Sequence, residues 1–135
     1  MTQSQETRRK LDHVAVAVKS IEESRHLFEL VSGEACSTPQ TLSEHGVRVA
    51  FVGHLELVEP LDTNSGVARF LQRHGQGLHH VAYRTDDLDG DLLQFKAKGI
   101  EPVGQIPQSG ASGHRVAFLR PSSTAGVLIE LVEYP

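Results

Sequence analysis

Two histidines and two glutamates hold matched places in the two halves of this chain. His13 and His80 each precede the dipeptide Val-Ala at a sequence offset of 67, and Glu56 and Glu130 match at an offset of 74. Imidazole nitrogens and carboxylate oxygens are ligands for divalent cations. Two neutral imidazoles with two carboxylates carry a charge of −2, which one divalent cation neutralises. If the halves meet about a pseudo-twofold axis, the four side chains can converge on one ion.

The matched residues belong to a longer internal repeat. Residues 46–51 (GVRVAF) recur at 113–118 (GHRVAF), at the same offset as the histidines, and residues 55–60 recur at 129–134, at the same offset as the glutamates. The change of offset predicts a loop seven residues longer in the second half. A repeat of this kind identifies the chain as an internal duplication and governs how its elements are read.

Each half predicts a strand, a helix and then three strands. Val14, Val16 and Val18 alternate with alanines, which is typical of a half-buried strand, and His13 shares the face of the alanines. Ser20 and Glu23 form a capping box at the start of a helix that Gly33 ends. The second half repeats the plan, with Asp86 or Asp87 as its helix cap. The other predicted strands cover residues 47–52, 55–58, 78–85, 116–119 and 127–132.

The predicted fold class is α+β, with two tandem βαβββ modules in a curved mixed sheet around a metal-containing cup and helices outside. Neither module buries its sheet face alone, so we expect a single domain over residues 11–135. Its modules cover about 11–61 and 78–134, and a linker over 62–77 contains a short helix capped by Ser65. Residues 1–10 are expected to be a disordered, solvated N-terminal segment.

Strand alternation separates the candidate ligands from their neighbours. His79 should lie on the opposite face from His80, as an outer residue or at the surface. Glu59 and Glu133 should lie on the opposite face from the candidate glutamates, in water. The remaining histidines have no counterpart in the repeat and are expected at the surface: His26, His45, His54, His74 and His114.

The ligand types favour Co, Mn, Ni, Fe(II) or Zn over Ca, and no cysteine set for structural zinc is present. Taken singly, a histidine in a strand is usually a core or rim residue, and Glu56 between leucines would usually face solvent. Recurrence of all four residues at equivalent places favours a shared site.

Bulk composition excludes several classes of function. The chain has 135 residues, a net charge of −4 and 39% hydrophobic residues, with no basic face for nucleic acid and no apolar run for a membrane span. No apolar signal region follows the polar start, so we expect a cytoplasmic protein. The single cysteine, Cys36, excludes an intrachain disulfide and alone gives no case for a nucleophile.

From about Leu11 to Tyr134 the sequence resembles the vicinal oxygen chelate superfamily, which includes glyoxalases, extradiol dioxygenases, bleomycin-resistance proteins and methylmalonyl-CoA epimerases. The match to the epimerases is carried by five segments, namely Asp12–Val18, Glu56–Leu61, Gly77–Ala82, Ser109–Gly113 and Gly126–Leu131. The His-Val-Ala core is common to the superfamily, whereas the Gly-Leu-His-His and Gly-Val-Leu-Ile-Glu-Leu runs resemble the epimerases more specifically.

The resemblance implies one divalent metal ion per chain, held by His13, Glu56, His80 and Glu130. Co²⁺ is favoured, with Mn²⁺, Ni²⁺, Zn²⁺ and Fe²⁺ as alternatives. It also implies epimerisation of (2R)- and (2S)-methylmalonyl-CoA, with Glu130 as an acid/base that moves the C2 proton through a metal-stabilised enolate. A homodimer is expected. In this family the position of Glu56 is glutamine or glutamate.

The sequence departs from the epimerase pattern at the second acid/base. The matching glutamate position is Val49 when Gly46 is aligned and Arg48 after a one-residue slip, and neither can be a base. Glu44, Glu56, a metal-bound water or a histidine remain alternatives. Arg120-Pro121-Ser122 also replaces a His-Pro-Lys run, so CoA contacts at that loop are not implied.

Two other kinds of function stay open. A glyoxalase-like or dioxygenase-like metalloenzyme would use a similar ligand set, because a shared fold does not select one chemistry. A binding or resistance protein would hold a small molecule between the modules without a metal, and such proteins usually lack the four-ligand set.

Overall fold

The structure is a computed structural model that describes residues 8–104 and 107–135. Its strands form a mixed sheet in the order β2-β3-β4-β1-β5-β8-β7-β6. The chain divides into two compact units, one of residues 13–80 and one of residues 81–135 with the N-terminal residues up to Asp12. The α+β class and the two tandem βαβββ modules predicted from the sequence are confirmed.

The elements of the first half follow the predicted order. They are β1 (Lys10–Ala17), α2 (Ile21–Ser32), β2 (Gln40–Leu42), a 3₁₀ turn η1 (Ser43–His45), β3 (Val47–Val52) and β4 (Leu55–Pro60). Strand β1 pairs in parallel with β4, and β4 pairs antiparallel with β3. The short β2 lies between α2 and β3 and completes the three strands predicted after the helix.

Helix α2 begins and ends as its sequence predicts. The hydroxyl of Ser20 accepts a hydrogen bond from the backbone N–H of Glu23 at 3.2 Å. Gly33 ends the helix at φ 76°, a left-handed conformation that glycine adopts without a Cβ clash. The apolar side of α2 packs on β1, β3 and β4 through a core of Val16, Val18, Ile21, Ala50, Val52 and Leu57.

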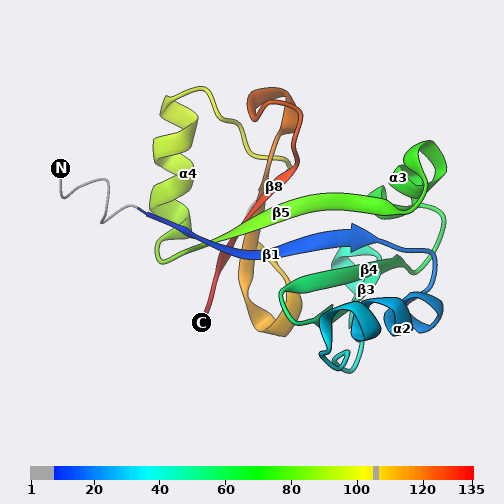
Figure 1. The fold of residues 1–135 in the computed structure, drawn as a ribbon. Coiled ribbons are helices and arrows are strands. Elements are labelled where there is room, and N and C mark those ends of the chain that lie inside the picture. The colour runs from blue at the N-terminus through cyan, green and yellow to red at the C-terminus, as the bar shows by residue number, and fades with distance from the viewer. Residues whose placement is uncertain (1–7, 105–106) are drawn as a thin grey trace. The chain divides into compact units, whose positions relative to one another are not determined.

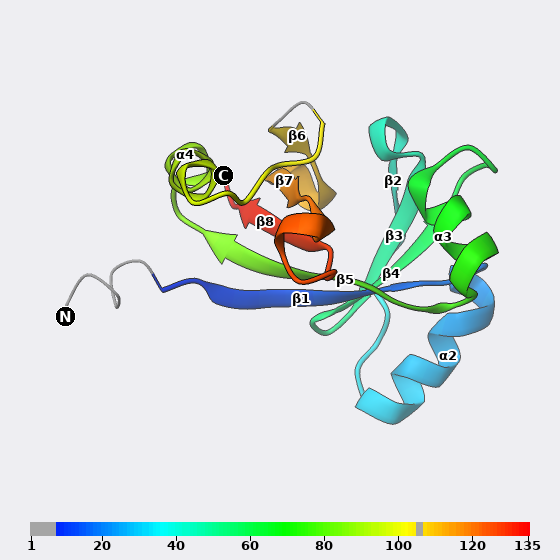
Figure 2. The ribbon, with the colours of Figure 1, turned by 90° about the horizontal axis from the view of Figure 1, so that it is seen from above.

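Helix α3 (Gly66–His74) follows β4 and covers the other side of the same strands. Figures 1 and 2 place α2 and α3 on opposite sides of β3 and β4. The predicted cap is confirmed, because the Ser65 hydroxyl accepts a hydrogen bond from the N–H of Ala68 at 3.1 Å. The strands of the first module therefore have a helix on each side.

The second half repeats the plan with β5 (Gly77–Thr85), α4 (Leu88–Ala97), β6 (Gln108–Ser109), η2 (Ala111–Gly113), β7 (Arg115–Leu119), η3 (Pro121–Ser123) and β8 (Ile129–Glu133). Strand β5 pairs in parallel with β8, and β8 pairs antiparallel with β7. The Asp87 carboxylate caps α4 by accepting from the N–H of Gly90 at 3.0 Å. Helix α4 packs on β7 and β8 through Leu88, Leu92, Ala117, Leu119 and Leu131.

Several boundaries differ from the predictions, among them the start of β8 and the extent of the N-terminal segment. Strand β8 begins at Ile129 because Val127 is held in the preceding turn, where its N–H donates to the Thr124 carbonyl at 3.1 Å. Residues 1–7 of the expected N-terminal segment lie outside the described residues. Arg9 does not fray, since its guanidinium pairs with Asp91 at 2.6 Å, and β1 begins at Lys10.

Candidate metal centre

Strands β1, β3 and β4 bring His13 beside Glu56. Glu56 lies opposite Phe51 across the β3–β4 pair and beside Ala15 across the β1–β4 pair. The His13 ring meets the Phe51 ring edge to face, with centroids 5.6 Å apart. All these side chains therefore share the face turned away from α2, as strand alternation predicts for His13.

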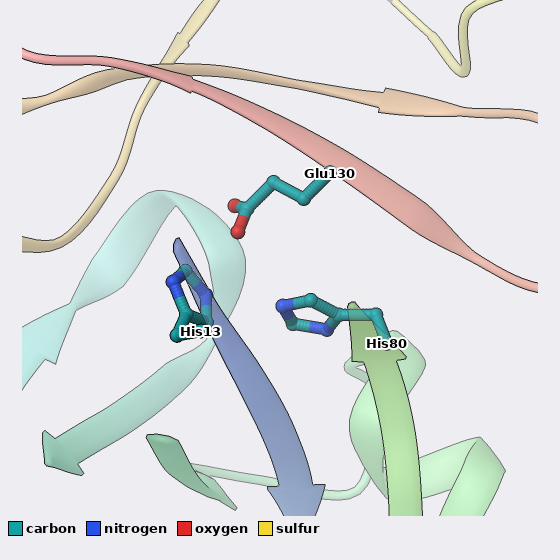
Figure 3. A group of neighbouring side chains, drawn as sticks. All are labelled: His13, His80 and Glu130. Carbon is teal, nitrogen blue, oxygen red and sulfur yellow. The ribbon is translucent and has the colours of Figure 1, made fainter. Parts of the chain in front are cut away.

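The three candidate ligands of residues 13–80 form a buried His/His/Glu cluster. The Nε2 atoms of His13 and His80 lie 3.3 and 3.6 Å from the same oxygen, Oε1 of Glu56. The exposed fractions of the side chains are 7%, 5% and 8% for His13, His80 and Glu56. The two imidazole ring centroids are 5.7 Å apart (Figure 3). A carboxylate so enclosed is costly unless a positive charge accompanies it.

The donor set of this cluster fits a divalent cation. Imidazole nitrogen and carboxylate oxygen are the mixed ligands that Co, Mn, Ni, Fe(II) and Zn accept. Three side chains whose donor atoms converge in a buried site form an arrangement that can bind one cation. Within the described residues, the only free cysteine is Cys36, and burial raises the pKa of its thiol, which disfavours the thiolate.

Glu130, the fourth predicted ligand, is buried on β8 in the unit of residues 81–135. It lies between Ala82 of β5 and Phe118 of β7 in the register of the strands. His13, His80 and Glu130 are all buried, and their donor atoms are of the types that suit a divalent metal (Figure 3). The identity of the ion and its ligation by all four residues stay predictions.

The strand that should carry the second acid/base contains none. Val49 lies opposite Val58 on the face of Glu56, and its side chain is buried. Arg48 lies on the opposite face, where its guanidinium is 3.8 Å from the Glu59 carboxylate. Glu44 is exposed in the turn η1. Strand β3 therefore supplies no second acid/base, and the alternatives stay Glu44, Glu56, a water or a histidine.

The prediction that Glu59 and Glu133 lie in water is wrong. Both do lie on the helix-facing side of the sheet. Glu59 accepts a hydrogen bond from the N–H of Ile21 at 2.8 Å, and Glu133 accepts one from the N–H of Leu88 at 2.9 Å. Each carboxylate thus satisfies a backbone donor in the first turn of its module's helix, where the first N–H groups lack partners within the helix.

Two other histidines differ from a simple surface assignment. The His114 ring stacks on Tyr134 with centroids 3.9 Å apart and is half-buried, so its predicted surface position is wrong. His79, expected on the opposite face from His80, places its Nδ1 2.8 Å from the Nδ1 of His80. Adjacency in a strand gives no signal for such a contact, because successive side chains leave on opposite sides. By contrast, His26 is 82% exposed on α2.

Comparison with known proteins identifies relatives over nearly the whole chain. Residues 12–118 match the Glyoxalase/Bleomycin resistance protein/Dioxygenase superfamily. The chain is 40% identical to the uncharacterized protein YqjC of Bacillus subtilis, over 92% of this chain and 91% of that protein. It is 39% identical to a mitochondrial methylmalonyl-CoA epimerase of Bos taurus, over 90% of this chain and 73% of that protein.

One solved structure is similar to this chain over nearly its whole length. A variant of Streptomyces coelicolor methylmalonyl-CoA epimerase, in complex with 2-nitronate-propionyl-CoA, is similar with a TM-score of 0.86 and 30% identity. The alignment covers 92% of this chain and 96% of that one. No helix in the described part of the chain has the length and apolar character needed to cross a membrane.

Proposed function

Because the chain belongs to the glyoxalase/bleomycin resistance protein/dioxygenase superfamily, we propose that it is an isomerase that interconverts (2R)- and (2S)-methylmalonyl-CoA. The single observation that carries the proposal is the buried cluster of His13, Glu56 and His80, found in a chain 39% identical to a methylmalonyl-CoA epimerase. The proposed ligands of one divalent ion are these three residues with Glu130.

The proposed ligands have separate roles at the site. His13 and His80 contribute neutral nitrogens, and the glutamates contribute the negative charge that retains a divalent ion. When bound, the ion supplies positive charge to substrate oxygens as negative charge develops on them. The burial of the cluster limits competition from water, which strengthens each electrostatic interaction.

Glu130 is the proposed carrier of the C2 proton. The C2 hydrogen of methylmalonyl-CoA lies between a thioester and a carboxylate, so its removal leaves an enolate. A carboxylate on one side of C2 removes the proton, and a second group on the other side delivers a proton to the opposite face of the enolate, which inverts C2; in the reverse reaction the two groups exchange roles. Val49 and Arg48 are not bases, which leaves Glu44, Glu56, a histidine or a water as the second group.

Proton exchange at C2 tests the reaction directly. Metal-loaded protein is mixed with (2R)-methylmalonyl-CoA in deuterium oxide, and NMR follows both the C2 proton and the appearance of the (2S) epimer. We expect deuterium incorporation together with epimerisation, both abolished by removal of the metal. Absence of exchange in a protein that holds its metal would reject the proposed reaction and favour another chemistry on the same scaffold.

We also propose that the chain assembles as a homodimer, since its modules present sheet edges and apolar helix residues that a second copy could cover. Leu30 and Val31 on α2 are 82% and 78% exposed. Light scattering at micromolar concentration should give twice the mass of one chain. A single sharp species of monomer mass would reject this assembly.

A further inference from the structure

Two ring nitrogens next to the candidate metal centre share a single hydrogen-bond position. The Nδ1 atoms of His79 and His80 lie 2.8 Å apart. Between neutral imidazoles, a contact of this length needs one nitrogen to carry a proton and the other to accept it. The direction of this hydrogen bond decides which nitrogen of His80 presents a lone pair.

His80 lies between two groups that attract its proton to different nitrogens. Oε1 of Glu56 is 3.6 Å from Nε2 and favours a proton on that atom, whereas Nδ1 of His79 is 2.8 Å from Nδ1. A proton on Nε2 would prevent His80 from binding a metal through the nitrogen that faces Glu56. Metal binding there requires the tautomer protonated at Nδ1.

We propose that His79 is a positioning residue for the metal centre. Its Nδ1 accepts the hydrogen bond from Nδ1–H of His80, and this contact selects the His80 tautomer whose Nε2 lone pair points at the cation. The inference rests on the proposed metal site and names a residue that acts on it through His80. A ligating histidine is commonly fixed in this way by an acceptor at its other nitrogen.

The orientation of His79 is itself supported by helix α3. The Phe70 ring meets the His79 ring edge to face, with centroids 4.9 Å apart and planes at 76°. Phe70 also packs on His74, whose centroid is 4.8 Å away. The segment between the repeated modules thus holds the ring of His79 in place, which gives α3 a role at the site.

The residue that precedes the repeated histidine differs between the two halves. Asp12 precedes His13 in the repeat as His79 precedes His80. Asp12 has no imidazole, and its carboxylate accepts a hydrogen bond from the hydroxyl of Tyr134. The residue that precedes His13 therefore does not offer it the imidazole acceptor that His79 offers to His80.

Two substitutions separate the hydrogen bond from the packing. His79→Phe keeps an aromatic ring against Phe70 but removes both nitrogens. His79→Asn places an amide oxygen, an acceptor, at about the position of Nδ1. Both variants are first compared with the wild-type chain by circular dichroism and thermal melting, so that affinity is measured on folded protein.

The first readout is the tautomer of His80 in metal-free protein labelled with ¹⁵N-histidine, from long-range ¹H–¹⁵N correlations. The second is Co²⁺ affinity by spectroscopic titration. We expect a proton on Nδ1 of His80 in the wild type and in His79→Asn, and a shift toward Nε2 in His79→Phe. The Phe variant should bind Co²⁺ about 10- to 100-fold more weakly, and the Asn variant should recover most of that loss.

Several results would overturn the inference. One is a wild-type His80 that carries its proton on Nε2, with His79 as the donor. Another is wild-type affinity in His79→Phe, or an equal loss in both variants, which would assign the effect to packing. Failure of the wild-type chain to bind Co²⁺ would overturn the metal site together with this inference. Tight Co²⁺ binding without epimerisation would overturn only the proposed reaction.

Discussion

The two modules hold their helices by the same contacts, but different side chains line the opposite faces of their sheets. In the first module, Arg48 approaches Glu59, and Glu59 accepts a hydrogen bond from a backbone N–H in the first turn of α2. In the second module, Arg115 pairs with Glu133, and Glu133 accepts a hydrogen bond from a backbone N–H in the first turn of α4. The two arginines match at the offset of the repeated histidines, and the two glutamates match at the offset of the candidate ligands. Repeated polar residues on the helix side therefore serve the fold.

The opposite faces of the modules diverge. In the first module, the row of Val49, Val58 and Ala17 is small and buried, on the side of the strands where α3 lies. In the second, Arg84 takes the place of Ala17 in the repeat and lies 3.8 Å from the centroid of the Tyr134 ring.

The second module closes this stack with His114 on Tyr134. Small or aliphatic residues hold the matched positions in the first module, where the second module has Arg84, Tyr134 and His114. A duplication thus kept the histidines and glutamates of the candidate centre while the surrounding faces changed. This difference indicates that the four polar residues are retained for a reason that packing alone does not supply.

The largest expected effect comes from the repeated histidines. His80→Ala and His13→Ala each remove a nitrogen beside Glu56, so both should lose metal and epimerase activity together. Metal content after equilibration with excess Co²⁺, together with turnover, measures this. His79→Ala is the control and should retain most of its metal when Co²⁺ is supplied well above the dissociation constant. Loss of metal from His79→Ala but not from His80→Ala would reverse our assignment of the two faces.

The repeated glutamates should not be equivalent. Glu130→Gln keeps an oxygen ligand but removes the base, so metal should stay while turnover falls about 10²- to 10⁴-fold. Deuterium exchange into one epimer should survive if a base acts on the other face. Glu56→Gln, the matched change, should keep most turnover because ligation needs only an oxygen. An equal loss in Glu56→Gln would identify Glu56 as the second base, and near-normal turnover of metal-loaded Glu130→Gln would remove Glu130 from the mechanism.

A third effect concerns stability and involves Asp91 of the second module with Arg9 of the N-terminal segment. Burial alone would raise the pKa of Asp91, but hydrogen bonds from Arg9 and Thr85 and the charge of Arg9 bring it below its ordinary value. Asp91→Asn should cost about 1–3 kcal/mol at pH 7 because it weakens a buried hydrogen-bonded pair. Ser24, the matched position on α2, has no such pair in the structure's described contacts, and Ser24→Ala should change stability little.

The pH dependence of this difference has a defined sign. The folded pKa of Asp91 lies below the unfolded one, so its contribution is complete above the unfolded pKa of about 4 and is lost as pH falls through the folded value. Denaturant unfolding of wild type and Asp91→Asn should therefore differ most near neutral pH and converge in acid. A gap that stays constant down to pH 2 would show that the charge of Asp91 is not involved.

The smallest expected effect tests the shared helix device. Glu59→Ala and Glu133→Ala should each cost about 1 kcal/mol, comparable to the loss of a helix cap, as measured by denaturant unfolding. The Gln variants keep an oxygen acceptor for the helix N–H and should lose less. Equal losses for Ala and Gln would assign the effect to the ion pairs with the arginines rather than to the helix N–H.

The sequence was sufficient for features that depend on local periodicity. Alternation placed His13 with the alanines, and the constant offset between matched segments identified two modules of the same plan. The cap of α2 followed from Ser20, and the cap of α4 was narrowed to Asp86 or Asp87, of which the structure has Asp87, since a cap needs only residues within one helical turn. Which of Val49 and Arg48 shares the face of Glu56 depends on the register of β3 against β4, and one sequence does not specify that register.

Tertiary structure alone decided how residues on separate elements meet. Glu59 and Glu133 face away from the candidate centre, as alternation predicts, but only the packing of a helix on each sheet turns them from solvated groups into acceptors. His79 leaves β5 on the far side from His80, yet ring rotation and the packing of Phe70 bring two nitrogens together. A strand's period determines which side a residue takes, while side-chain torsions and neighbouring elements determine what it touches.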